Sequence, residues 1–168
     1  PAGAGTSGGD EGLRDTAVAQ RPLVATALLS ARALLADGVP DAVCGHSVGE
    51  LPALAVAGIL SDDEAIALAE VRGRLMSAAT KQLATGMAAV LGGDVDAVLA
   101  ATGSLALEVA TVNTPGQVVV GGPVAVLNAV PAAPPTGARV RTTAAAGASD
   151  APALASAGEA FAAGRPTP

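Results

Sequence analysis

The sequence predicts an α/β protein in which a small subdomain interrupts a larger unit. Three observations support this. Apolar residues recur at helical spacing up to about residue 85, short apolar strands begin near residue 86, and strands and helices then alternate to residue 143. We therefore expect residues 86–143 to form the small subdomain, and residues 1–85 and 144–168 to belong to the larger α/β core.

Three helices are expected before about residue 85, where the spacing of the apolar residues changes. Pro22 suits the first turn of a helix that runs to about residue 36. A second helix is expected over 50–57, with Gly58 near its end. Ser61 and Glu64 form a capping box that opens a third helix, to about residue 80. The apolar side of the first helix is expected to contain Leu23, Val24, Leu28, Leu34 and Leu35.

The segment after residue 85 has the order strand, helix, strand, strand, helix, strand, which is typical of a ferredoxin-like unit. A further helix is expected over 151–163. The expected strands are 87–91, 107–112, 117–121 and 139–143, the helices are 94–101 and 124–130, and a turn is expected over 113–116.

Composition excludes several classes of protein. The net charge is −6, because the chain has nine Lys and Arg but fifteen Asp and Glu, so a broad nucleic-acid surface is not expected. The single cysteine, Cys44, permits no internal disulfide and fits a reducing compartment. No apolar run approaches the length of a membrane span, and no basic segment followed by an apolar one opens the chain. A cytoplasmic protein is the expectation.

Residues 45–49 have the Gly-X-Ser-X-Gly pattern of a nucleophile elbow, centred on Ser47. Such a turn lifts Oγ above a sheet and puts the Val48 amide at a helix N-terminus, where it can donate to an oxyanion. Composition alone predicts about 0.1 such matches. The apolar run 42–44, read as a buried strand, and the following helix strengthen the catalytic interpretation. The alternative is a glycine-rich turn.

His46 is the chain's one histidine. Because adjacent side chains point in different directions, its imidazole is not expected to reach Oγ of Ser47 well. A packed or hydrogen-bonded structural histidine is favoured over a general base. Cys44 is expected to be a small buried side chain in the strand.

Four segments together are similar to malonyl transacylases and to the acyltransferase domains of polyketide synthases. They occur in the family's order and spacing across nearly the whole chain. The segments are LRDTAVAQ at 13–20, GHSVGE at 45–50, VRGRLM at 71–76 and VNTPGQVV at 112–119.

The resemblance implies an α/β-hydrolase-like core, incomplete here, with an inserted ferredoxin-like subdomain. It implies that Ser47 accepts malonyl from coenzyme A and passes it to the phosphopantetheine thiol of an acyl carrier protein, in fatty-acid or polyketide synthesis. Malonyl-CoA is then a substrate, and neither a cofactor nor a metal is expected.

The same resemblance assigns the site residues. Ser47 is the nucleophile, the Val48 amide is an oxyanion donor, and Arg72 binds the malonyl carboxylate; His46 and Asn113 belong to the substrate site. The alternative for Arg72 is a solvated helix arginine. The adjacent mid-helix Gly73 weighs against it, since glycine there costs about 1 kcal/mol relative to alanine. An apolar residue after the serine is more typical of malonyl than of methylmalonyl specificity.

The chain departs from the family at residue 150. Asp150, in the run GASDA at 147–151, stands where the family has its catalytic histidine. An aspartate with a pKa near 3.9 is a much weaker base, and its charge would repel malonyl. Impaired activity is therefore expected. In the alternative, Asp150 is a solvated loop residue without a role.

The family also begins before residue 1, with a Gly-Gln-Gly loop, and continues past residue 168, so a fragment is expected. Two other functions remain open. One is a serine hydrolase such as a thioesterase, and the other is a degenerate domain that binds carrier protein or coenzyme A without turnover.

Overall fold

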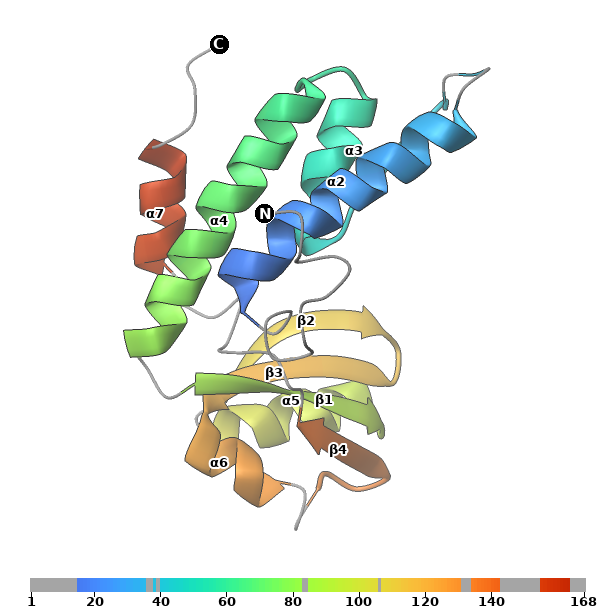
Figure 1. Cartoon of the computed structure of the whole chain (residues 1–168). Helices are drawn as coiled ribbons and strands as arrows, with labels where there is room; N and C mark the ends of the chain where they lie inside the picture. Colours follow the sequence, from blue (N-terminus) through green and yellow to red (C-terminus); the bar gives the residue numbers. More distant parts are fainter. Residues whose placement is uncertain are drawn as a thin grey trace. The chain divides into compact units, whose positions relative to one another are not determined.

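The computed structural model describes residues 15–35, 38, 40–82, 85–105, 107–130, 134–142 and 155–163 (Figure 1). Within these residues the chain forms two compact units, one from residues 15–75 with 161–163 and the other from residues 76–160. The first unit is helical in its described part, and the second is built around a sheet.

Helix α2 (Thr16–Leu34) begins before the position that the sequence predicts. The carboxylate of Asp15 caps it by accepting a hydrogen bond of 2.9 Å from the amide of Ala17. Pro22 consequently lies inside the helix and not in its first turn, so that prediction was wrong. A proline lacks the N–H that would donate to the carbonyl four residues earlier. Capping by Asp15 starts the helix despite that missing hydrogen bond.

The buried side of α2 is narrower than predicted. Val24 and Leu28 are buried, whereas Leu23 is 56% exposed and Leu34 is 85% exposed. Successive helical residues are rotated by about 100°, so residues spaced by four share one face. Leu23 and Leu34 therefore lie well to the side of the stripe through Val24 and Leu28.

The first unit has one apolar cluster that joins α2 to three other helices. These are α3 (Glu50–Val56), α4 (Asp62–Gln82) and α7 (Ala155–Ala163). The helix predicted over 50–57 is confirmed, and Gly58 follows it with φ +75°. The cluster consists of Val24, Leu28, Leu51, Ala55, Ala65, Leu68 and Ala69, with Val48, Leu60, Ile66 and Phe161 packed against it.

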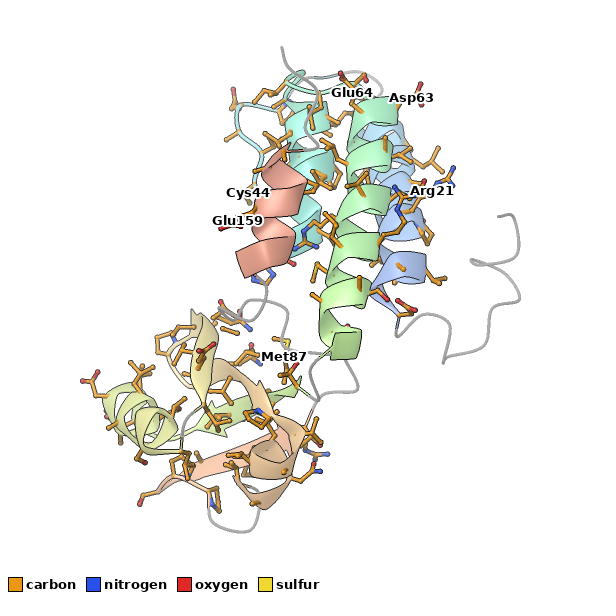
Figure 2. The ribbon with its side chains drawn as sticks, turned by 90° about the vertical axis from the view of Figure 1, so that its left-hand side faces the viewer. Arg21, Cys44, Asp63, Glu64, Met87 and Glu159 are labelled. Atoms are coloured by element: carbon orange, nitrogen blue, oxygen red, sulfur yellow. The ribbon has the colours of Figure 1, made fainter. Side chains whose placement is uncertain are left out.

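The predicted capping box at the start of α4 is confirmed. The Ser61 amide donates to Oε2 of Glu64 at 2.7 Å, and the Glu64 amide donates to Oγ of Ser61 at 3.2 Å. These bonds from the backbone and side chain of Ser61 hold the pKa of the Glu64 carboxyl below its ordinary value. Figure 2 shows Asp63 and Glu64 on the surface at this end of α4.

Two exposed ion pairs also connect α2 with α4. Arg32 Nη2 lies 2.7 Å from Oδ1 of Asp62, and Arg21 Nη1 lies 3.5 Å from Oε2 of Glu70. The first pair lowers the pKa of the Asp62 carboxyl through its hydrogen bond with Arg32. Because both pairs are exposed to solvent, they add little to stability.

The second unit has the predicted order of strands and helices. Its four strands form an antiparallel sheet in the order β2-β3-β1-β4. The elements are β1 (Thr85–Gly92), α5 (Val95–Ser104), β2 (Glu108–Thr114), β3 (Gln117–Pro123), α6 (Val124–Ala129) and β4 (Ala138–Thr142).

Helices α5 and α6 cover the same face of this sheet (Figure 1). Alternate residues of the central strands face them, as the two-residue period of a strand requires. The shared core contains Ala88 and Val90 of β1, Val118 and Val120 of β3, Val98 of α5 and Leu127 of α6.

The strand predicted over 42–44 is absent, and that prediction was wrong. Val43 is 39% exposed and Cys44 is exposed. A strand needs a neighbour to pair with its backbone groups, and the described part of the first unit contains no other strand. None of the helices described here has both the length and the apolar character that a membrane crossing requires.

Gly73 brings the backbones of α2 and α4 into contact. A Cβ atom added at Gly73 would collide with the carbonyl oxygen of Thr16 and lie 3.3 Å from Cα of Ala17. Oγ1 of Thr16 donates a hydrogen bond of 3.2 Å to the carbonyl of Gly73. This mid-helix glycine therefore has a packing reason, which is the close approach of the two helices.

We expect Gly73→Ala to lower the free energy of unfolding by about 1–3 kcal/mol, as overpacking does. The collision with the Thr16 backbone should outweigh the helix propensity of alanine. Gly103→Ala is the matched control, because Gly103 lies in α5 with nothing within 4 Å of an added Cβ. That variant should gain about 0.5–1 kcal/mol. Urea denaturation measures both, and equal gains would contradict the assigned role of Gly73.

Candidate active site

Ser47 has an unusual backbone conformation. Its φ is 56°, and every other described residue with a positive φ is a glycine. Such a conformation costs of order 1–3 kcal/mol, and strained residues of this kind cluster at functional sites. His46 before it is extended, with φ −114° and ψ 129°, and the short helix η1 (Ser47–Gly49) follows. The chain therefore turns sharply at Ser47, as a nucleophile elbow requires.

The two glycines around Ser47 have different roles. A Cβ on Gly45 would collide with the carbonyl group of Gly49, so the turn requires glycine at residue 45. The Gly49 amide donates to the His46 carbonyl at 3.0 Å and closes the turn. Gly49 itself has φ −66°, and an added Cβ would meet nothing within 4 Å among the described atoms. Steric crowding therefore explains the first glycine of the pattern but not the second.

The guanidinium of Arg72, on α4, reaches the serine. Its Nη2 donates a hydrogen bond of 3.2 Å to Oγ of Ser47, and its Nη1 donates one of 2.9 Å to Oε1 of Gln20. Arg72 is half-buried. The fold thus sets a permanent positive charge beside the hydroxyl group, where it can attract an anionic group bound next to Oγ.

Gln20 is the member of this set that the sequence patterns did not single out. It lies on α2 and is 5% exposed. A signal was present, because Gln20 falls four residues before Val24 and eight before Leu28, on the same stripe of the helix. A polar residue on an apolar stripe needs a hydrogen-bond partner, and Arg72 supplies one.

Val48 and His46 flank the serine in different environments. The Val48 side chain packs against the apolar cluster of the first unit. Its amide belongs to the first turn of η1, where amides have no intrahelical acceptor. His46 is exposed, so the prediction that its side chain is packed was wrong. Among the described residues, no hydrogen bond joins its imidazole to Ser47.

Two other predicted site residues do not belong to the described part of the first unit. Asn113 lies in β2 of the second unit, where its Nδ2 donates to Oε1 of Gln117 at 3.0 Å. This bond spans the turn that contains Gly116, with φ +97°. Asp150 lies outside the described residues. No group of three His, Cys, Asp or Glu side chains in the described part of the chain could hold a metal ion.

Comparison with known sequences gives a consistent set of relatives. The model of the acyl transferase domain family matches residues 6–164. The malonyl CoA-acyl carrier protein transacylase of Mycolicibacterium smegmatis is 47% identical over 147 residues, which are 86% of this chain and 51% of that protein. Polyketide synthase GfsB of Streptomyces halstedii is 41% identical over 73% of this chain and 2% of its own length.

Solved structures agree with the sequence comparison. The crystal structure of MCAT from Mycobacterium tuberculosis superposes with a TM-score of 0.88 at 42% identity, over 96% of this chain and 55% of that one. A malonyl-transacylase in complex with its type II PKS acyl-carrier protein gives 0.80 at 28% identity, over 94% and 53%. The chain spans about half the length of the curated transacylases that it matches. By sequence and by α/β fold, it belongs to the acyl transferase domain family.

Proposed function

We propose that the protein accepts a malonyl group from a coenzyme A thioester on Ser47 and transfers it to the phosphopantetheine thiol of an acyl carrier protein. The contact of 3.2 Å between Arg72 and Oγ of Ser47 carries this proposal. It combines a serine in a strained turn with a cation beside it, in a family whose relatives are named for malonyl transfer. The comparison structure with a bound carrier protein supports that partner.

In the first step, Oγ of Ser47 attacks the thioester carbonyl. The Oγ–C bond forms, the C–S bond to coenzyme A breaks, and the serine proton ends on the departing sulfur. The Val48 amide is the proposed donor to the oxyanion that develops on the carbonyl oxygen. In the second step the carrier thiol attacks the acyl-serine, and its proton returns to Oγ.

Arg72 is the proposed receptor for the malonyl carboxylate. In a malonyl thioester one methylene separates the carboxylate from the reacting carbonyl. A receptor for it must therefore lie close to the nucleophile, and Arg72 meets this condition. The planar guanidinium can bind both carboxylate oxygens. On binding, the carboxylate takes the hydrogen bond that Nη2 makes to Oγ and leaves the serine ready to attack.

We further propose that residues 86–143 are a ferredoxin-like subdomain inserted in an α/β-hydrolase-like core made of residues 1–85 and 144–168. The strand order β2-β3-β1-β4 with both helices on one face supports this assignment. His46 and Asn113 are proposed to line the substrate site. We propose a cytoplasmic location and a role in fatty-acid or polyketide synthesis; the relatives' names refer to malonyl transfer and to polyketide synthesis.

A thioesterase is the first alternative, and Arg72 weighs against it, because hydrolysis of a thioester needs no carboxylate receptor beside the serine. A non-catalytic domain is the second, and Asp150 favours it. An aspartate is a poor acceptor for the serine proton near neutral pH.

Ser47 is expected to carry the acyl group. After incubation of the protein with malonyl-CoA, peptide mass spectrometry should find malonyl on the peptide that contains Ser47. Ser47→Ala should abolish the adduct, because it removes the proposed nucleophile. Ser104→Ala, at the exposed end of α5, is the control and should retain it. An adduct that persists in Ser47→Ala would overturn the assignment.

Arg72→Ala should reduce malonyl loading far more than acetyl loading, since acetyl lacks the carboxylate. Loss of a buried charged pair costs roughly 2–5 kcal/mol, so the preference for malonyl should fall more than tenfold. Arg74→Ala is the matched control, because Arg74 lies on the same helix in an exposed ion pair with Glu70. Equal losses for the two acyl groups would assign Arg72 a structural role.

Asp150→His should raise the rate of transfer to carrier protein. A histidine near its ordinary pKa can take and return the serine proton, and such assistance contributes about 10²–10⁴-fold. Stopped-flow transfer rates compare the parent with the variant, and Ser47→Ala provides the background. A parent that already turns over at about 1–10³ per second would contradict the impaired-base hypothesis.

A further inference from the structure

The hairpin that contains Asn113 has a turn that does not match the twist of its strands. Thr114 pairs with Gln117, so the loop between β2 and β3 consists of Pro115 and Gly116 alone. A proline followed by a glycine with φ +97° fits a type II turn. Hairpins with two-residue loops favour turns of types I′ and II′, because a type II turn splays the flanking strands. The tip of this hairpin therefore needs support from outside its own two strands.

Gly92, the last residue of β1, supplies that support. Its amide donates a hydrogen bond of 2.8 Å to the carbonyl of Gly116. This bond lies just past Leu91 and Gln117, the last paired residues of β1 and β3. A Cβ added at Gly116 would lie 4.0 Å from Cα of Gly92, which is an ordinary van der Waals distance. The tip of the hairpin is thus held against the end of β1.

Residue 92 requires glycine. Its φ is +81°, a conformation that residues with a Cβ rarely adopt. A Cβ added there would also lie only 2.9 Å from the carbonyl oxygen of Gly137, the residue before β4. A side chain would therefore force the end of β1 away from Gly137 or change its φ. Either change moves the amide that holds the carbonyl of Gly116.

The orientation of the Asn113 side chain depends on the same turn. Its Nδ2 donates to Oε1 of Gln117 across the turn at 3.0 Å, and its Oδ1 accepts a longer bond of 3.4 Å from Oγ1 of Thr111. Asn113 is exposed, so burial does not hold its carboxamide in place. The carboxamide keeps its orientation only while the turn keeps Asn113 and Gln117 close together.

We propose that Gly92 is a positioning residue for Asn113 in the reaction with malonyl-CoA. This inference rests on the proposed function, in which Asn113 lines the substrate site. Gly92 acts through the carbonyl of Gly116, which fixes the turn that Asn113 and Gln117 span. Binding of the substrate then depends in part on a backbone contact at the end of β1.

The hydrogen bond can be measured in the unmodified protein. A hydrogen bond transmits a scalar coupling from the donor nitrogen to the acceptor carbon. A long-range HNCO spectrum should therefore contain a cross-peak between the nitrogen of Gly92 and the carbonyl carbon of Gly116. The Gly92 amide should also exchange slowly with solvent, although Gly92 is exposed. A fast-exchanging amide without the cross-peak would overturn the inference.

Gly92→Ala tests the consequence for Asn113. The side-chain amide signal of Asn113, identified by its loss in Asn113→Asp, should shift and exchange faster in this variant. Gly92→Asn should change the signal in the same way but less, because asparagine adopts a positive φ more readily than alanine. It serves as the second variant if Gly92→Ala does not fold. An unchanged Asn113 signal in a folded variant at residue 92 would contradict the proposal.

Gly137→Ala is the matched control. Gly137 also has a positive φ, +74°, and lies in the same unit. A Cβ added there would make only an ordinary contact, 3.7 Å from Cα of Gly93. This variant has a similar conformational strain without the collision at residue 92, so the Asn113 signal should stay in place. An equal shift in both variants would mean that strain alone disturbs the hairpin, and would overturn the inference.

Loading of Ser47 from malonyl-CoA tests whether Gly92 acts through Asn113. Gly92→Ala should lower kcat/KM about tenfold, as a misplaced group does. The same change in an Asn113→Ala background should lower it no further, because the group that Gly92 positions is then absent. Additive losses would assign Gly92 a general structural role and overturn the inference.

The two kinds of measurement distinguish the possible failures. A protein that has the cross-peak and shifts its Asn113 signal in Gly92→Ala, but takes no malonyl on Ser47, supports the positioning of Asn113 by Gly92 and contradicts the proposed function. A protein that loads malonyl equally well with and without Gly92 contradicts the inference and leaves the proposed function in place.

Discussion

The backbone contact between α2 and α4 at Gly73 sets the geometry of the candidate site, because it decides how near the two helices can approach. Since glycine has no Cβ, the carbonyl of Thr16 can lie against α4. One turn further along α2, Gln20 then comes within hydrogen-bond distance of Arg72. Arg72 in turn reaches Ser47. A wider separation of α2 and α4 would remove the hydrogen bond between Gln20 and Arg72.

Small buried side chains also allow close packing elsewhere in the first unit. Ala55 of α3 and Ala65 and Ala69 of α4 lie in its apolar cluster with almost no exposure, so these positions contribute little side-chain volume to the core. Each alanine buries little apolar area, and the stabilisation per residue is modest. Close packing therefore depends on fit, and a single added methyl group has large effects at such contacts.

In the proposed mechanism, substrate recognition and proton transfer depend on separate parts of the chain. Arg72 is the proposed receptor for the carboxylate, and its hydrogen bonds with Gln20 and Ser47 lie within the first unit. Proton transfer from Ser47 concerns residue 150, where an aspartate stands. Because both steps of the proposed mechanism move a proton to or from Oγ of Ser47, a weak base would slow the capture of the acyl group as well as its transfer.

Local signals in the sequence determined much of the fold. The capping box at Ser61, the helix over 50–57 and the order of elements between 86 and 143 follow from caps and periodicity, which act between near neighbours in the chain. The sequence also determined Ser47 as the candidate nucleophile. The absence of a strand at 42–44 and the contacts of Arg72 with Gln20 and Ser47 were decided by the tertiary structure, whereas the early start of α2 follows from a local signal, the Asp15 cap. Those contacts join residues 52 and 25 positions apart, and such distances are bridged by packing, which no local pattern encodes.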